Sequence, residues 1–115
     1  MNNLGLALLG QSRFEKALEQ YQTALAVEPD YAFGHNNLGL ALMYLGRAAE
    51  ALPHFQKAVD LVPDYVLAHN NLGGDLLMLG RIDEAIAQYK QALELRPDYA
   101  AAAAMLRIAE AQRSP

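Results

Sequence analysis

Asn-Asn-Leu-Gly occurs three times in this chain of 115 residues, at Asn2–Gly5, Asn36–Gly39 and Asn70–Gly73. Each copy begins 34 residues after the previous one, and other residues recur at the same interval. One of them is the triplet Pro-Asp-Tyr, which occupies residues 29–31, 63–65 and 97–99. A period of this length is typical of one supersecondary unit stacked on copies of itself. The sequence therefore predicts a repeat protein.

The recurring residues resemble the tetratricopeptide repeat, whose pattern is Trp-x2-Leu-Gly-x2-Tyr, then Ala-x3-Phe, then Pro. The second unit reads His35-x2-Leu38-Gly39-x2-Leu42, Ala51-x3-Phe55, Pro63. The first unit places Met1, Leu4, Gly5, Leu8, Ala17, Tyr21 and Pro29 in these slots, and the third places His69, Leu72, Gly73, Leu76, Ala85, Tyr89 and Pro97. The resemblance covers essentially the whole chain. It departs from the pattern where His or Met replaces Trp and where Leu replaces the first Tyr.

What the resemblance implies is an all-α, right-handed α-solenoid of seven helices. Three tandem helix-turn-helix units and a C-terminal capping helix are expected: a first unit with a truncated start at 1–31, then 32–65 and 66–99, and the capping helix and tail at 100–115. The A helices are expected at about 2–10, 32–45 and 66–79, and the B helices at about 13–27, 47–61 and 81–95. Because the repeat register starts within helix A, we expect a fragment of a longer array. The alternative is an uncovered end, with Leu4 and Leu8, that pairs with another copy.

Glycine and proline predict where the helices end. Gly46 and Gly80 supply the positive φ that terminates helix A, whereas Ser12 fills the same slot in the first unit and makes that turn the least certain. Between units, Asp64 after proline is a good N-cap for the next helix. Pro53 falls inside the second B helix, where it should kink the helix unless the helix begins late, near residue 49.

Small residues predict close packing between helices. We expect the glycines of the A helices to face the alanines of the B helices, as in Gly39 against Ala51. A second set of alanines is expected to pack against the following unit: Ala24, Ala58 and Ala92.

The composition suits a helical domain and excludes several functions. Hydrophobic residues make up 53% of the chain, cysteine is absent and the formal net charge is −4. The lack of cysteine excludes disulfides and thiolate chemistry, and an acidic chain without clustered Lys and Arg argues against nucleic acid. No apolar run approaches the ~18–20 residues of a membrane span, and no signal peptide is evident. The compartment is unknown from sequence, and the cytoplasm is the expected location for such a fragment.

Charge is distributed unevenly between the two sets of helices. Residues 2–10 and 33–45 contain no Asp, Glu, Lys or Arg, and the third A helix has only Asp75, whereas the B helices carry many charged residues. In tetratricopeptide arrays the A helices line a concave groove and the B helices form the convex back. The resemblance therefore implies a neutral groove and a charged, solvated back.

Helical spacing identifies the candidate groove residues. They are Phe33, Asn36, Asn37, Leu40, Met43 and Tyr44 in the second A helix, and Leu67, Asn70, Asn71, Gly74, Leu77 and Met78 in the third. With Asn3, the residues Asn37 and Asn71 form a row of amides that resembles the asparagine ladder of O-linked N-acetylglucosamine transferases, which grips the backbone of an extended peptide. An amide offers both a donor and an acceptor to a peptide group. The alternative is that these asparagines are capping or solvated residues near helix starts.

A second resemblance can be tested on the sequence and fails. Tetratricopeptide domains that bind the acidic C-termini of heat-shock chaperones use Lys, Asn, Asn, Lys and Arg as a carboxylate clamp. The corresponding residues here are Asn2, Leu6, Asn37, Leu67 and Asn71. Because a carboxylate needs charge-assisted partners, an acidic chaperone tail is not expected to bind.

Catalysis has almost no support in the sequence, so we do not expect an enzyme, a metal or a cofactor. His35 and His69 are equivalent repeat residues, for which packing or groove lining is sufficient explanation, and His54 is alone on a B helix. No Ser-His-Asp arrangement or glycine-rich phosphate loop is present. Tyr31, Tyr65 and Tyr99, one per repeat after each Asp, are expected to pack between units.

The leading functional prediction is a protein–protein interaction scaffold that binds an extended peptide or partner segment in its concave groove. The alternatives are a self-assembling module that stacks through its N-terminal face, or the substrate-recruiting arm of a larger enzyme. A separate hypothesis concerns Asp75, which replaces a small residue beside the capping helix. Arg107 lies at the slot where the other units have glycine, so the two are predicted to form an ion pair that fastens the cap.

Overall fold

The computed structural model describes the backbone of residues 3–113 and the side chains of residues 13–113. In that part every regular element is an α-helix, and short turns connect the helices. The helices are α1 (Asn3–Val27), α2 (Ala32–Tyr44), α3 (Ala48–Leu61), α4 (Val66–Met78), α5 (Ile82–Leu95) and α6 (Ala100–Arg113). The bounds of α2 to α5 agree with the predicted ranges to within a residue at each end. Residues 3–113 thus form six helices rather than the seven predicted.

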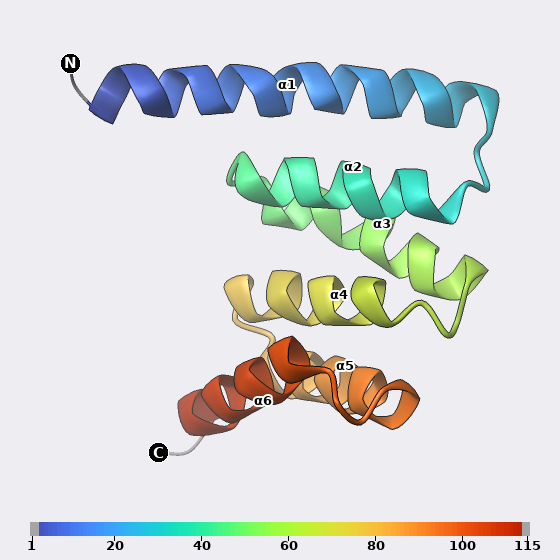
Figure 1. Ribbon diagram of the computed structural model, residues 1–115, viewed down its shortest axis with the longest axis vertical. Coiled ribbons are helices and arrows are strands. Elements are labelled where there is room, and N and C mark those ends of the chain that lie inside the picture. Colours follow the sequence, from blue (N-terminus) through green and yellow to red (C-terminus); the bar gives the residue numbers. More distant parts are fainter. Residues whose placement is uncertain (1–2, 114–115) are drawn as a thin grey trace.

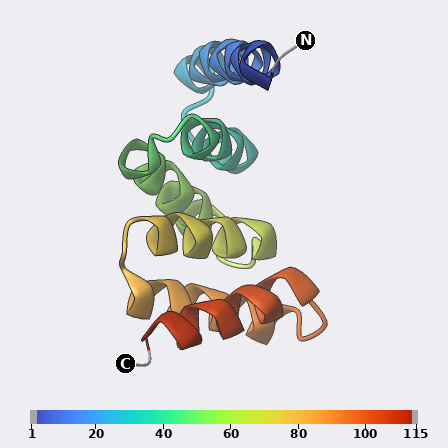
Figure 2. The ribbon, with the colours of Figure 1, turned by 90° about the vertical axis from the view of Figure 1, so that its left-hand side faces the viewer.

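The helices follow one another through a stack (Figure 1), and the view from the side shows the same order (Figure 2). Each helix packs against the next one in the chain, and α4 additionally contacts α2 and α6. The stack measures 39 × 38 × 24 Å. No helix in the described part is long and apolar enough to cross a membrane.

The first unit differs from the prediction because its two helices are one. α1 runs without interruption from Asn3 to Val27, so the break expected between residues 10 and 13 is absent. The physical reason is the residue in the turn slot: Ser12 stands where the later units have glycine, and a serine continues the helix more readily than it adopts positive φ. The exposed edge expected at Leu4 and Leu8 lies outside the described side chains.

The turns inside the later units are formed as predicted. Gly46 and Gly80 are the residues with positive φ in the described chain, each at 78°. After α2, the Gly46 N–H donates to the Met43 carbonyl at 3.0 Å and the Arg47 N–H donates to the Leu42 carbonyl at 2.8 Å. This is the Schellman arrangement, which satisfies carbonyls at the helix end.

The turns between units do not use aspartate as a cap. Tyr31 and Tyr65 occupy the N-cap positions of α2 and α4, and neither helix has a side-chain capping hydrogen bond. The prediction that Asp64 caps the next helix is therefore wrong. Each helix begins one residue too late for the carboxylate to reach its first free N–H groups.

The core is a continuous row of buried apolar side chains, among them Phe55, Leu72 and Tyr89. Gly39 leaves room for this row: an added Cβ there would lie 2.8 Å from the ring of Phe55, and at Gly73 it would lie 2.7 Å from the ring of Tyr89. The glycines thus accommodate an aromatic ring, whereas the prediction had them facing Ala51 and Ala85. A larger residue would displace a ring that has no free space to enter.

The small residues of the B helices are buried only where an A helix covers them. Ala58 and Ala92 are fully buried, whereas Ala24 is exposed, contrary to the prediction. Within the described chain α1 contacts only α2, and α2 leaves the face of α1 that carries Ala24 uncovered.

Candidate peptide-binding groove

Most predicted groove residues are accessible to solvent. Phe33, Tyr44, Leu67 and Met78 are exposed, and Asn37, Leu40, Met43, Asn70, Asn71, Gly74 and Leu77 are half-buried. Asn36 is the exception, because only 1% of its surface is exposed. The side chain of Asn3 lies outside the described residues.

Asn36 joins two helices and does not line an open groove. The Asn71 amide Nδ2 donates a hydrogen bond of 2.9 Å to Asn36 Oδ1, which links α4 to α2. The Asn36 amide Nδ2 has no hydrogen-bond partner and lies near the phenol of Tyr65, whose pKa is raised chiefly by burial and lowered in part by this amide. The prediction for Asn36 was wrong because α2 turns this side chain toward the next unit. Asn37, one residue on, is left as the accessible amide of α2.

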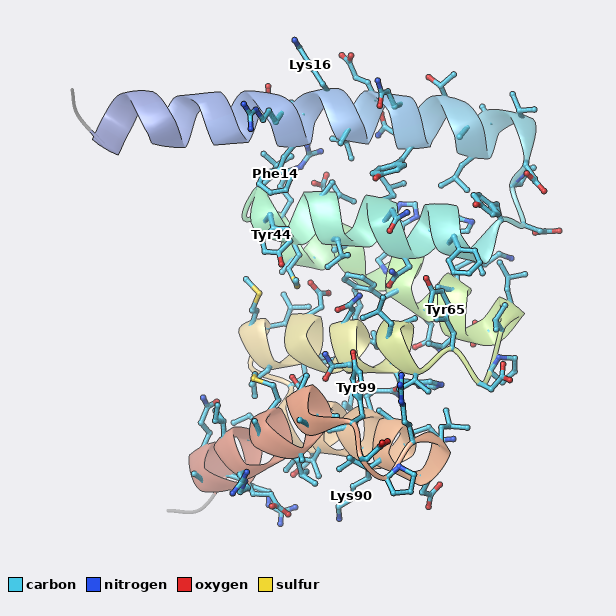
Figure 3. The ribbon with its side chains drawn as sticks, in the orientation of Figure 1. Phe14, Lys16, Tyr44, Tyr65, Lys90 and Tyr99 are labelled. Atoms are coloured by element: carbon cyan, nitrogen blue, oxygen red, sulfur yellow. The ribbon has the colours of Figure 1, made fainter. Side chains whose placement is uncertain are left out.

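Aromatic side chains form two groups along the predicted groove. Phe33 is the middle of one group: its ring centroid lies 5.9 Å from that of Tyr31 and 5.1 Å from that of Tyr65, both in edge-to-face arrangement. In the other group, Phe14 stacks on Tyr44 at 5.1 Å, and the two rings meet across the seam between α1 and α2 (Figure 3). Tyr31 and Tyr65 therefore pack between units as predicted. Phe14 was not predicted, because it lies on a B-type segment that the family resemblance assigns to the back.

Two pockets coincide with the predicted groove residues. One, of about 200 Å³, is lined by Phe14, Ala17, Tyr21, Asn37, Leu40, Ala41 and Tyr44. The other, of about 390 Å³, is lined by Met43, Gly74, Leu77, Met78, Met105 and Gln112. None of these side chains is charged, so the two pockets offer apolar and aromatic surface with a few amide groups.

Two of the ion pairs in the described chain lie elsewhere, at the starts of α3 and α5. Arg47 pairs with Glu50 at the start of α3, and Arg81 pairs with Glu84 at 2.7 Å at the start of α5. Both pairs are exposed, so solvent screens them and they contribute little to stability. None of these four charged residues lines either of the two pockets.

The histidines are partnered, which corrects one prediction. His54 is not alone: its Nδ1 lies 3.1 Å from Nδ1 of His35. In the next unit, His69 Nδ1 lies 2.8 Å from the side-chain oxygen of Gln88. Among the described residues there is no group of three or more His, Cys, Asp or Glu side chains that could hold a metal ion.

The predicted ion pair between Asp75 and Arg107 is not formed. Asp75 is fully buried and neither carboxylate oxygen has a hydrogen-bond partner, while Arg107 is exposed on α6. Burial raises the pKa of Asp75 to about 6. The prediction was wrong because α6 presents Arg107 to solvent, and a free guanidinium keeps its hydration there.

The comparisons with known proteins agree with this architecture. The family described as "Tetratricopeptide repeat" matches residues 30–98, and the one described as "TPR repeat" matches residues 5–46. The chain belongs to the tetratricopeptide repeat family. A comparison with curated protein sequences finds no match.

The solved structures that are similar to the chain include two of a first TPR domain described as that of RPAP3. The first TPR of Spaghetti (RPAP3), bound to the HSP90 peptide SRMEEVD, has a TM-score of 0.86 and 26% identity over 92% of this chain and 85% of that one. The first TPR domain of human RPAP3 has a TM-score of 0.84 and 25% identity over 90% of this chain and 81% of the other. Domains of this family are generally non-catalytic protein-interaction modules, and the first of these two similar domains is bound to a peptide.

Proposed function

We propose that the chain binds an extended, uncharged segment of a partner protein along the surface formed by Asn37, Leu40, Tyr44, Asn71 and Met78. The observation that supports this most directly is the overlap of the two uncharged pockets with accessible amide and aromatic side chains. A peptide backbone needs donors and acceptors along its length, which amides provide. Exposed aromatic rings provide anchors for apolar side chains at low entropic cost.

In this proposal the chain retains the division expected from the sequence, a right-handed array of three units with α6 as the cap. The first unit is altered, because its two segments form one helix. The groove then extends from Phe14 and Tyr44 at one end to Met78 and Met105 at the other.

The partner differs in charge from the peptide seen with the similar domain. SRMEEVD, the peptide bound to Spaghetti, carries three acidic side chains. Anions need cationic partners, and the described groove positions Asn37, Leu67 and Asn71 offer none. We therefore propose that this groove favours neutral segments with apolar or aromatic side chains over acidic tails.

The experiment is a selection from a displayed library of random peptides, followed by calorimetric titration of the enriched sequences. Asn37→Ala combined with Tyr44→Ala is expected to weaken binding at least tenfold, because a side-chain hydrogen bond contributes about 0.5–1.5 kcal/mol and an aromatic anchor commonly 2 kcal/mol or more. Asn71 is left intact, because its loss would leave Asn36 unpaired.

Lys90→Ala is the matched control, because this side chain points away from the stack (Figure 3). It should bind the selected peptides as the unaltered chain does. Circular dichroism verifies that each variant stays folded. Enriched peptides that bind the double variant with unchanged affinity, or an enrichment of acidic peptides such as SRMEEVD itself, would contradict the proposal.

A further inference from the structure

His35 and His54 form a contact between two imidazole rings at the junction of three helices. His35 lies on α2 and His54 on α3, and their Nδ1 atoms are 3.1 Å apart. The rings are stacked, with centroids 5.4 Å apart and planes inclined by 23°. The other nitrogen of His35, Nε2, lies 2.6 Å from the carbonyl oxygen of Pro29. The pair thus ties the turn that follows α1 to both α2 and α3.

The Pro29 carbonyl determines where the protons lie. A carbonyl oxygen only accepts hydrogen bonds, so Nε2 of His35 carries a proton. In neutral His35 the other nitrogen, Nδ1, is then an acceptor. His54 must therefore donate its Nδ1–H to it, which leaves Nε2 of His54 as the free site for an additional proton.

The hydrogen bond between the two rings survives one additional proton but not two. One additional proton can be bound at Nε2 of His54, and the hydrogen bond between the rings remains. A second additional proton must go to Nδ1 of His35. Two N–H groups then point at each other and two positive rings stand face to face. Both effects oppose the contact, so the doubly protonated pair must separate.

The surroundings offer no carboxylate to offset the second charge. The rings line a pocket of about 290 Å³ whose other walls are Gln22, Leu25 and Ala26 of α1, Pro29, and Leu38 of α2, all uncharged. Across the same seam the charged groups are Asp30 in the turn and Lys57 on α3. They are paired with each other at 3.9 Å and are exposed.

The next unit provides a natural comparison. His69 replaces His35 and Gln88 replaces His54, each 34 residues further on. His69 Nε2 lies 2.7 Å from the Pro63 carbonyl oxygen, as in the first junction, and Nδ1 lies 2.8 Å from Gln88 Oε1. An amide can rotate to present either its oxygen or its NH₂ group. Gln88 can therefore partner both neutral and protonated His69.

We propose that the His35–His54 pair is an acid-sensitive latch that holds the turn after α1 against α2 and α3. The latch is closed with up to one additional proton and opens with the second. The His69–Gln88 pair is its acid-insensitive counterpart. This inference is independent of the proposed peptide binding.

The contact opposes the second additional proton, and the lowered pKa of His54 acts in the same direction, because in both cases the folded chain binds fewer protons than the unfolded chain. Burial, and secondarily the charge of His35, lower the pKa of His54, so in the folded chain it lies below the usual ~6.5. The unfolded chain then binds more protons between the two pKa values. The stabilisation is complete above pH ~6.5 and is lost as the pH falls through that value toward the lowered pKa.

The test measures amide hydrogen exchange, corrected for intrinsic rates, at pH 7.5 and pH 5.0. The readouts are matched amides: Tyr31 and His35 at the first junction, which donate to Glu28 and Tyr31 carbonyls, and Tyr65 and His69 at the second, which donate to Val62 and Tyr65 carbonyls. At pH 5.0 the amides of Tyr31 and His35 should lose about tenfold in protection, within the range of local opening free energies in folded proteins. The second pair should change little.

Two variants, each of which gives one junction the side chain of the other, make the test decisive. His54→Gln gives the first junction the side chains of the second and should abolish the acid effect at Tyr31 and His35. Gln88→His should create the effect at Tyr65 and His69. Both are made in an Asp75→Ala background, because Asp75 titrates in the same range with the opposite sign. An acid-induced loss at the first junction that persists in His54→Gln, or one that is equal at both junctions of the unaltered chain, would overturn the proposal.

Discussion

Asp75 replaces an alanine of the repeat with a carboxyl group that has no partner. Ala41 occupies the same slot one unit earlier and is 3% exposed, so the site itself is apolar and closed. Leaving a buried polar group unsatisfied costs about 1–3 kcal/mol. The same burial raises the pKa of Asp75, because it disfavours the charged form of the carboxyl group.

Asp75→Ala is therefore expected to stabilise the fold by about 1–2 kcal/mol at pH 7.5. The gain should shrink as the pH falls. The pKa of about 6 in the folded chain lies above the ordinary value of 3.8, so the folded chain binds more protons in that window and the unaltered protein gains stability there. Urea unfolding of both proteins at pH 7.5 and pH 4.5 measures the difference. A gain that is larger at pH 4.5, or a loss at pH 7.5, would show that Asp75 has a stabilising partner.

At the scale of the element, α3 contains a proline that α5 lacks. Pro53 lies in the second turn of α3, which begins at Ala48, so the late start considered from the sequence does not place it in the first turn. A proline there removes the N–H that would donate to the carbonyl of residue 49, and its ring crowds that carbonyl. The equivalent residue of α5 is Ala87.

Pro53→Ala is expected to stabilise the fold by about 1–3 kcal/mol, since proline inside a helix is less favourable than alanine by up to ~3 kcal/mol. Pro53 is exposed, so the change leaves no buried cavity. The midpoint of urea unfolding should rise while the slope stays constant. Ala87→Pro is the reciprocal control and should lower the midpoint. An unchanged midpoint for Pro53→Ala would mean that α3 has already adapted to the proline.

At the scale of the whole molecule, the helices differ in how many neighbours hold them. α4 contacts α2, α3, α5 and α6, whereas α1 contacts only α2 within the described chain. Figure 1 shows the N-terminal part of α1 extending past the end of α2. In stacked repeats each element is stabilised mainly by its neighbours, so local opening should be easiest at α1.

We expect backbone amides of α1 to exchange at least tenfold faster than those of α4 at pH 7.5. A difference of that size corresponds to ~1.4 kcal/mol in opening free energy, and such gradients are common in folded proteins. Hydrogen exchange followed by mass spectrometry resolves the two helices. Uniform exchange across α1 and α4 would instead indicate that the chain opens as one cooperative unit.

Much of the fold is local and was therefore predictable from the sequence. Gly46 and Gly80 end helices because of a backbone property of glycine, and the 34-residue period repeats that turn wherever glycine recurs. The same argument explains the failure at residue 12, where serine allows α1 to continue. Glycines beside aromatic rings, such as Gly39 beside Phe55, were recognised as packing positions, although their partner was not.

Most residues of the predicted groove are accessible on α2 and α4, but which of them are accessible could be decided only from the structure. The helical period places Asn36 and Asn37 on adjoining faces, and only the rotation of α2 against α4 determines which one is buried. The same holds for the pairs Asn36–Asn71 and His35–His54. Each pair joins side chains from different helices, so its contact depends on how those helices pack and not on local spacing.

The sequence by itself determined the repeat, the positions of five helices and the scarcity of charge in the segments that form α2 and α4, because these follow from periodicity, backbone preference and composition. The tertiary structure alone decided that Asp75 lies buried without Arg107 and that His54 meets His35. Those outcomes depend on the angle and depth at which neighbouring helices pack. Side-chain volumes across the whole core set that geometry, and no short stretch of sequence specifies it.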